Sequence, residues 1–347
     1  MKRFIALCAV SALWGGGVFA LDVAPGGESL FLYGQPKFLA GAADAAGGPV
    51  FSAGSYSFNM NPALTAGLQC LSADLGYTGI VNTDSETLAS AARLGLSVPN
   101  RFGVFSGALQ GFFGEDAVGI GNVAVARAGF SRDVTENFYL GVSVSFGMLF
   151  YEDNQDFYAG ADVGAWSRVP SIAFLKNVRF GLTVQNIGKS FDTAGPVKDF
   201  KVFSYPAMFT PKLGVAASFL DIKDLEAGFS LDAAFPTFAN IVFNAGLQLQ
   251  IKNIVVVSAG WDFNLREYVD GSAVHGPVVG VGVKIQLNTS GSELMSKRGF
   301  SQTDIDADLL WQDRGDGLQM ISVGAAASFG VKDTIAPEIK IGEIRLR

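Results

Sequence analysis

An apolar residue alternates with a small or polar one through most of this chain, from residue 71 to 329, and turn-like clusters interrupt the alternation at short intervals. The pattern is clearest over residues 243–251, where Asn244, Gln248 and Gln250 stand between apolar or small neighbours. Side chains on a strand point alternately to its two faces, so such a segment has one apolar face and one polar face. Inside a bilayer every backbone polar group must be bonded internally, which only helices and closed barrels achieve. The alternation therefore predicts an all-β fold, a closed antiparallel barrel that crosses a membrane with its strands.

The composition agrees with this prediction. The chain is 49% hydrophobic and only 16% charged, with 43 glycines and 29 phenylalanines, which is too apolar and too rich in turn residues for an ordinary soluble domain. No segment after the amino terminus is apolar enough for a membrane helix, and hydrophobicity spread through alternation is what a barrel requires. The formal net charge of −7 argues against nucleic acid as a partner.

The first twenty residues are typical of a secretory signal. Two basic residues precede the apolar run Phe4–Val18, and Ala20 ends a small-residue cleavage site, so we expect residues 1–20 to be removed and the protein to be exported to the cell outer membrane. A retained membrane helix or lipidation at Cys8 are the alternatives. With Cys8 removed, Cys70 would be the only cysteine, so no intramolecular disulfide is expected.

About fourteen alternating segments can be counted after residue 70, and an even number closes an antiparallel barrel with both ends on one side. The predicted strands are Leu71–Val81, Thr87–Val98, Arg101–Phe112, Val118–Ser131, Phe138–Tyr151, Phe157–Arg168, Val178–Ile187, Pro211–Leu220, Leu225–Phe235, Asn240–Ile251, Ile254–Leu265, Pro277–Leu287, Asp304–Gln312 and Leu318–Gly330. The connections after even-numbered strands are short, as periplasmic turns are, except the one from Asn288 to Thr303. That connection predicts either a short helix or a missed pair of strands.

The stretch ahead of the first strand is rich in glycine and alanine and lacks the alternation, so we expect it to lie inside the barrel. Leu39–Ala45 and Phe58–Leu64 resemble the amino-terminal hatch of the FadL-type long-chain fatty-acid transporters of the outer membrane. The specific part is Asn61-Pro62-Ala63-Leu64, where an asparagine that can bond its own backbone precedes a proline with fixed φ, a combination that makes a rigid bend. A plain turn before a strand is the alternative.

The resemblance implies a fourteen-stranded transmembrane barrel (residues 71–331) plugged by its own amino terminus (residues 21–70), with a carboxyl-terminal tail at 332–347. It also implies passive uptake of long-chain fatty acids or other hydrophobic small molecules, gated by the hatch. The expected partners are the hydrophobic ligand, outer-membrane lipid and the barrel assembly machinery. The chain is also similar to the PorV-like shuttle barrels of secretion systems, which share the Asn-Pro-Ala element and the pattern around residues 184–188. Those relatives imply a structural, partner-docking barrel without small-molecule transport.

A carrier of hydrophobic molecules needs an apolar pocket with a few polar or cationic groups. The candidates are aromatic residues near strand ends and in the longest loop, with two lysines for an anionic head group: Phe112, Phe113, Phe191, Phe200, Phe203, Tyr205, Lys198 and Lys201. Girdle residues at the membrane interface are the competing interpretation of these aromatic residues. A continuous apolar cavity beside Asn61 would favour transport, and a lumen filled by paired charges would favour docking.

Asp304, Asp306 and Asp308 alternate along one strand, so all three carboxylates are expected on the lumen face, with Arg179 and Lys284 on the same kind of inward position. A cation could bind there, but calcium requires six or more converging oxygens, so a solvated polar wall is the simpler interpretation. The single histidine, His275, cannot form a zinc site or a hydrolytic triad by itself. We therefore expect no enzyme activity, no metal and no cofactor. An outer-membrane lipase, the third hypothesis, lacks a visible nucleophile and base.

Overall fold

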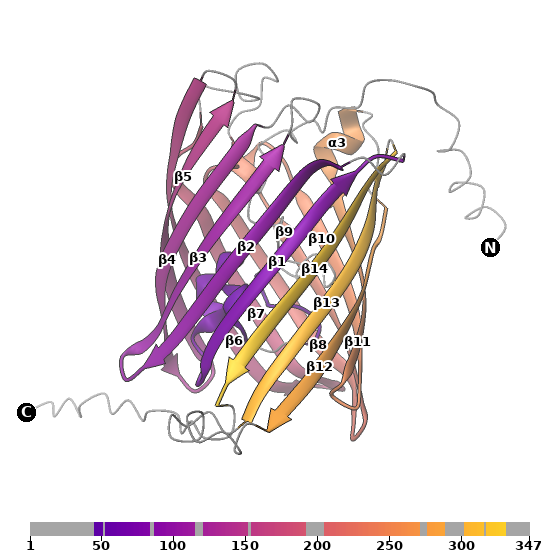
Figure 1. The fold of residues 1–347 in the computed structure, drawn as a ribbon. Helices are drawn as coiled ribbons and strands as arrows, with labels where there is room; N and C mark the ends of the chain where they lie inside the picture. The colour runs from indigo at the N-terminus through magenta and orange to yellow at the C-terminus, as the bar shows by residue number, and fades with distance from the viewer. Residues whose placement is uncertain are drawn as a thin grey trace, which may run out of the picture.

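The computed structural model describes residues 45–50, 53–83, 87–114, 121–151, 154–191, 205–270, 276–288, 302–315 and 317–330. Fourteen strands form one closed antiparallel barrel, in which each strand pairs with its neighbours in sequence and β14 closes onto β1 (Figure 1). The predicted fold is therefore confirmed. The strands are β1 Leu71–Val81, β2 Thr87–Asn100, β3 Gly103–Gly114, β4 Asn122–Thr135, β5 Phe138–Tyr151, β6 Asn154–Ile172, β7 Leu175–Lys189, β8 Thr210–Ile222, β9 Leu225–Ala234, β10 Val242–Ile251, β11 Val255–Asn264, β12 Val278–Asn288, β13 Gln302–Gly315 and β14 Leu318–Phe329.

Most predicted strands are too short at one or both ends. The predicted strand Phe157–Arg168 is β6, which pairs with β7 as far as Ile172 opposite Leu175, because backbone pairing continues after the alternation of side chains has ended. The predicted strand Val118–Ser131 is β4, which starts at Asn122 and runs on to Thr135, and residues 118–120 lie outside the described part of the chain. β12 and β13 pair directly with each other, so no further strand lies between them in the barrel, and the connection at 289–301 lies outside the described residues.

Alternation sorts the side chains between the two faces of the barrel wall. Leu94, Val144 and Leu247 are each more than half exposed on the outside, whereas Arg93 and Ser143, each beside one of them in sequence, are buried inside. The exposed apolar side chains on the outside of the strands suit contact with lipid rather than with water. Soluble monomers rarely expose large continuous apolar patches. In the described part of the chain, no helix has the length and hydropathy needed to cross a membrane.

The two ends of the barrel differ in their connections. At the short-turn end, hairpins such as Glu136–Asn137 and Lys223–Asp224 join successive strands. The turn at Lys252 and Asn253 has φ values of 53° and 56°, as the twist of a tight hairpin requires. At the other end, which we call the loop end, several connections are longer, and two of them include the short helices η4 (Pro236–Phe238) and α3 (Leu265–Asp270).

The described part of the predicted hatch, residues 45–50 and 53–70, lies inside the barrel, and we call it the plug segment (Figure 1). It contains two short 3-10 helices, η1 (Ser55–Asn59) and η2 (Pro62–Thr65). The first lies against β1, β2 and β3, and the second lies against β4, β5 and β6. The predicted signal peptide at 1–20, the start of the hatch at 21–44 and the tail at 332–347 lie outside the described residues.

Candidate functional site

Asn61 fixes the bend of the plug segment, as its sequence context predicts. Its side-chain oxygen accepts a hydrogen bond from the Ala63 N–H at 3.0 Å and so caps η2, whose first residue is Pro62. Its Nδ2 donates to the carbonyls of Ala45 (2.9 Å) and Ala165 (3.1 Å). One buried amide therefore ties two parts of the plug segment to each other and to β6 of the wall.

Inward-facing glycines let the plug segment lie directly on the wall. A Cβ at Gly141 would collide with the backbone of Pro62 and Ala63, and one at Gly164 would collide with the Asn61 side chain. On β7, a Cβ at Gly181 would collide with the carbonyl of Ala45. Three further inward glycines lie on β4, β8 and β9: Gly129, Gly214 and Gly228. We call all six glycines together the glycine track. The glycine track is a groove in the wall that only residues without a side chain can form.

Three arginines of the wall hold backbone carbonyls of the plug segment. Arg93 donates to the Ser55 carbonyl at 3.0 Å, and Arg127 donates to the Asn59 carbonyl at 2.8 Å. Arg179 donates to the carbonyls of residues 48 and 49 at 2.6 and 2.7 Å. A carbonyl oxygen accepts a hydrogen bond from a cation more strongly than from a neutral donor. These contacts therefore hold the plug segment through its backbone and do not depend on which side chains it carries.

Two of these arginines belong to buried ion pairs within the wall. Arg93 pairs with Asp74, and Arg127 pairs with Asp162. The carboxylate of Asp162 also accepts from the Ser143 hydroxyl at 2.5 Å and from the backbone N–H of Asn186 at 2.8 Å. Such pairs are stable in a dry interior only when further hydrogen bonds satisfy both partners. The Arg127–Asp162 pair therefore joins the plug segment to β5, β6 and β7.

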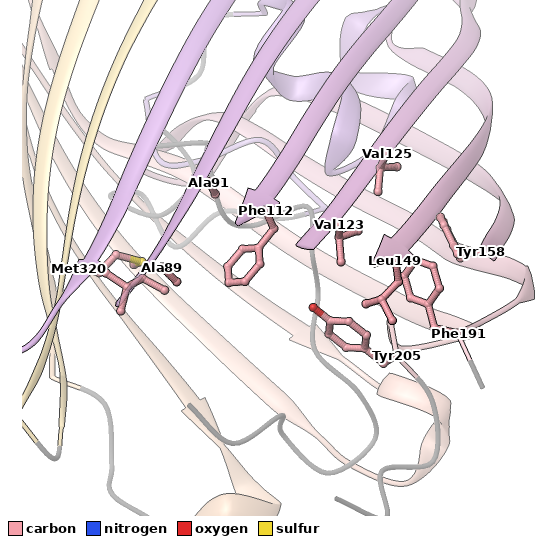
Figure 2. Packing of buried hydrophobic residues seen from close by; sticks show 11 residues of the cluster. Ala89, Ala91, Phe112, Val123, Val125, Leu149, Tyr158, Phe191, Tyr205 and Met320 are labelled. Carbon is pink, nitrogen blue, oxygen red and sulfur yellow. The ribbon is translucent and has the colours of Figure 1, made fainter. Parts of the chain in front are cut away.

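An apolar cluster lines the lumen near the loop end, and we call it the mouth cluster (Figure 2). Its members come from the loop-end halves of β14 and β1–β6 and from the two segments that flank the loop after β7. They are Ile80, Ala89, Ala91, Phe112, Val123, Val125, Leu149, Tyr158, Phe191, Tyr205 and Met320. All are buried inside the barrel, so this part of the lumen wall is apolar where the opposite wall carries charges.

Phe191 and Tyr205 close the mouth cluster from the side of the loop. The Phe191 N–H donates to the Tyr205 carbonyl at 2.8 Å, so the two described residues that flank 192–204 are bonded to each other. The Phe191 ring lies 6.0 Å from both the Tyr205 ring and the Tyr158 ring. Figure 2 shows both rings within the cluster, together with Leu149 and Tyr158. These two residues lie outside the barrel strands and form an isolated bridge with each other, whereas the other members of the cluster lie on strands.

A line of polar contacts joins the mouth cluster to the plug segment. The Tyr158 hydroxyl lies 2.6 Å from the Ser145 hydroxyl and donates to the Asn186 side-chain oxygen at 2.8 Å. Asn186 has φ of 57° and forms a bulge in β7, opposite Asp162. From there the Asp162–Arg127 pair leads to the plug carbonyl of Asn59.

The polar wall is on the other side of the lumen, and the structure places the predicted residues inward. Lys284 Nζ lies 3.3 Å from an Asp304 carboxylate oxygen, and Lys284 faces Asp306 across the β12–β13 ladder. Asp306 and Asp308 are partly exposed, whereas Arg179 is buried against the plug segment. Within the described ranges, no group of three or more acidic, histidine or cysteine side chains could hold a metal ion.

Three of the predicted ligand residues meet in the mouth cluster: Phe112, Phe191 and Tyr205. Phe113 lies on the outer face of β3 with 52% of its surface exposed, because adjacent strand residues point in opposite directions. The two neighbouring phenylalanines therefore do not share a site. Phe200, Phe203, Lys198, Lys201 and His275 lie outside the described residues.

Sequence reasoning identified Asn61 and placed Arg179 on the lumen wall, but it missed other residues that hold the plug segment. Arg93, Arg127 and Asp162 were not identified, although each is a charged residue at an inward position of an alternating strand. The glycines of the glycine track also occupy inward positions, on neighbouring strands. Both signals are visible once the inward positions are assigned, since an inward charge requires a partner and a run of inward glycines leaves space for a backbone.

Comparison with solved structures identifies outer-membrane channels as neighbours of this fold. A monoaromatic hydrocarbon channel, the TodX deltaS2S3 mutant, is 12% identical, with a TM-score of 0.55 over 86% of this chain and 99% of the other. The toluene transporter TodX of Pseudomonas putida is 11% identical, with a TM-score of 0.52 over 91% and 100%. A Pseudomonas aeruginosa FadL homologue is 10% identical, with a TM-score of 0.49 over 86% and 98%.

No protein-family model and no curated protein matches the sequence. At identities this low the likeness concerns the fold alone. At that level the predicted resemblance to FadL-type barrels is confirmed.

Proposed function

We propose that this protein is an outer-membrane channel for passive uptake of hydrophobic small molecules, with long-chain fatty acids as the sequence-based candidate, through a barrel gated by its amino-terminal hatch. The observation that carries the proposal is the mouth cluster: an apolar lining near the loop end of a lumen whose wall grips the plug segment. An apolar lining inside a barrel suits a ligand that gains free energy by leaving water. The names of the structural neighbours, a hydrocarbon channel and a toluene transporter, agree with it.

In this proposal, the ligand enters from the loop end and displaces the rings of Phe191 and Tyr205 from the mouth cluster. Aromatic rings and ligand exchange one apolar contact for another, so the step requires no energy source. The ligand then passes the plug segment, whose bend at Asn61-Pro62 and following Ala63-Leu64 act as the gate. No bond is made or broken, and no residue acts as a catalyst.

The contacts between the mouth cluster and the plug segment give this gate a route for communication. A ligand that moves Phe191 disturbs the Tyr158 ring beside it, and the Tyr158 hydroxyl bonds Asn186 in the bulge. Asn186 and Arg127 share Asp162, and Arg127 holds a plug carbonyl. Because each of these groups is buried, weakening one bond leaves its neighbour unsatisfied and favours release of the plug.

Outer-membrane lipid and the barrel assembly machinery are the expected partners of such a barrel. The outward face includes a depression of about 940 Å³ over β2–β7, floored by small residues such as Gly107, Ala126 and Ala128 between Leu109 and Val144. Lipid chains would fill it, because it lies in the apolar belt.

Binding and uptake test the proposal together. Purified protein should retain a hydrophobic ligand in native mass spectrometry, and protein in liposomes should carry fluorescent fatty acid inward faster than empty liposomes do. Phe112→Ala should lower the affinity, since Phe112 is a strand residue of the mouth cluster that stays in place when the rings of Phe191 and Tyr205 are displaced. An empty lumen and uptake equal to that of empty liposomes would refute the channel.

A structural barrel that docks a secretion partner is the second candidate. The two buried ion pairs beside the plug segment, Arg93–Asp74 and Arg127–Asp162, favour it, because paired charges fill part of the lumen. Co-purification of a partner protein with an empty lumen would support docking. The channel is preferred for two reasons. Both arginines also bind the plug segment, so the ion pairs have a role in gating. A docking barrel, in contrast, does not need an apolar mouth cluster inside its lumen.

A further inference from the structure

The inward-facing side chains differ in exposure between the two sides of the lumen. Those that hold the plug segment are buried: Arg93 is 2% exposed, Arg127 4% and Arg179 3%. Asp306 and Asp308 also point inward, from β13, and they are partly exposed. Lipid covers the outside of a membrane-spanning barrel, so an inward side chain that is accessible must be reached by water through the lumen.

The plug segment extends across the lumen as far as β10, where the Val50 N–H donates to the side-chain oxygen of Gln248 at 3.0 Å. At each glycine of the glycine track, an added Cβ would meet atoms of the plug segment. At Gly282 on β12, it would instead meet the side chains of Asp308 and Val256, which belong to the wall. At Gly282 the wall is therefore covered by its own side chains and not by the plug segment.

Partly exposed inward side chains continue along this wall from the loop end towards the short-turn end. Asn244 and Asp262 face each other across the β10–β11 ladder near the loop end, and Gln248 lies further along β10. Lys284 and Asp306 face each other across the β12–β13 ladder nearer the short-turn end. All of these groups bind water, and an apolar ligand would have to remove that water at a cost in free energy.

We propose that the inward side chains of β10–β13 line a second route through the lumen, the side passage, which carries small hydrophilic solutes and ions past the plug segment while the plug stays in place. This inference goes beyond the proposed function, in which hydrophobic molecules pass the mouth cluster and the plug segment must move. A hydrophilic solute exchanges hydrogen bonds with water for hydrogen bonds with these side chains and with the water held between them, so it passes without a large desolvation cost.

Conductance and swelling test the side passage. Purified wild-type protein in planar bilayers should carry a steady potassium chloride current with no hydrophobic ligand present. Liposomes that contain the protein should swell in arabinose faster than empty liposomes do. Absence of both effects would overturn the side passage. Uptake of fluorescent fatty acid is a separate measurement, so this result would not refute the proposed function.

Asp308→Cys in a Cys70→Ser background locates the current. Its thiol faces the side passage, so a water-soluble methanethiosulfonate should react with it and remove at least about half of the current, because the attached group narrows the route. Ala216→Cys in the same background is the matched control. Ala216 faces the lumen on β8, opposite Arg179, and is completely buried, so the reagent should leave that current unchanged.

Gly324→Cys is the second variant, because Gly324 lies opposite Asp308 in the β13–β14 ladder. It places a thiol in the same passage without removing a charge, and the reagent should cause the same loss of current. A current that the reagent leaves unchanged in both variants would overturn the side passage. Loss of current in Ala216→Cys would also overturn it, since solutes would then pass on the side of the plug segment, as they would if the plug moved.

Discussion

At the scale of single residues, the account depends on how buried charges are satisfied. Asp162 is the most connected of them, since it receives Arg127, the Ser143 hydroxyl and the Asn186 N–H. Its carboxylate is completely buried. Burying a carboxylate costs desolvation free energy, and only this complete set of partners offsets that cost for Asp162. A change to any one partner should therefore affect both stability and gating.

Asp162→Asn should therefore destabilise the barrel strongly, by about 3–5 kcal/mol, because it leaves Arg127 as an uncompensated buried cation. Urea unfolding in liposomes, followed by tryptophan fluorescence, measures this change. Lys176→Ala serves as the control, because the Lys176–Asp221 pair is about half exposed and its loss should cost at most about 1 kcal/mol. Equal effects of the two variants would contradict the assigned role of Asp162.

Pro62 supplies a second prediction at this scale. Pro62→Gly frees φ at the first residue of η2, so the plug segment should loosen and the leak conductance in planar bilayers should rise. Pro236→Gly is the matched control, since Pro236 also begins a 3-10 helix but lies at the loop end away from the plug segment. Unaltered conductance and uptake in Pro62→Gly would remove the hatch from the mechanism.

At the scale of elements, the fit of the plug segment to the wall depends on the glycine track. Gly164→Ala places a Cβ against Asn61, so it should displace η2, raise the leak conductance and cost about 1–3 kcal/mol of stability. Gly107→Ala is the control, because Gly107 faces outward and its added Cβ would meet the Arg127 carbonyl only at an ordinary contact distance of 3.7 Å. If Gly164→Ala behaves like Gly107→Ala, the plug does not depend on contact with this wall.

The elements also show what the sequence could predict. Period-two alternation sufficed for the number, order and facing of the strands, because each strand must present one face to lipid and one to the lumen. The bend at Asn61 was predictable because its cause is local, a side chain that bonds a backbone two residues away. The contacts of Arg127 with Asn59 were not predictable, since they join positions 68 residues apart and require the register of the barrel. Phe112 and Phe191 could be proposed individually, but only the closed barrel brings them together.

At the scale of the whole molecule, the lumen has two different sides. The mouth cluster lies on β14 and β1–β6, and the plug segment extends as far as β9 and β10, whereas β12 and β13 carry the polar wall of Lys284 and the aspartates. A lumen divided in this way can bring an apolar ligand along one wall while water remains at the other. The proposed channel function depends on one claim: the plug segment must move before a ligand can pass through the lumen.

A disulfide between the plug segment and the wall tests that claim most directly. Ser55 of the plug and Ser72 of β1 have hydroxyl oxygens 3.3 Å apart, so cysteines at both positions, in a Cys70→Ser background, are placed to cross-link. Thr78→Cys with Ser322→Cys provides a control cross-link within the wall, between β1 and β14, where the hydroxyls are 2.6 Å apart. We predict that oxidation of the Ser55–Ser72 variant abolishes uptake of a hydrophobic probe into liposomes, that a reductant restores it, and that the wall cross-link changes nothing. Full uptake through a plug that is demonstrably cross-linked to β1 would contradict the account.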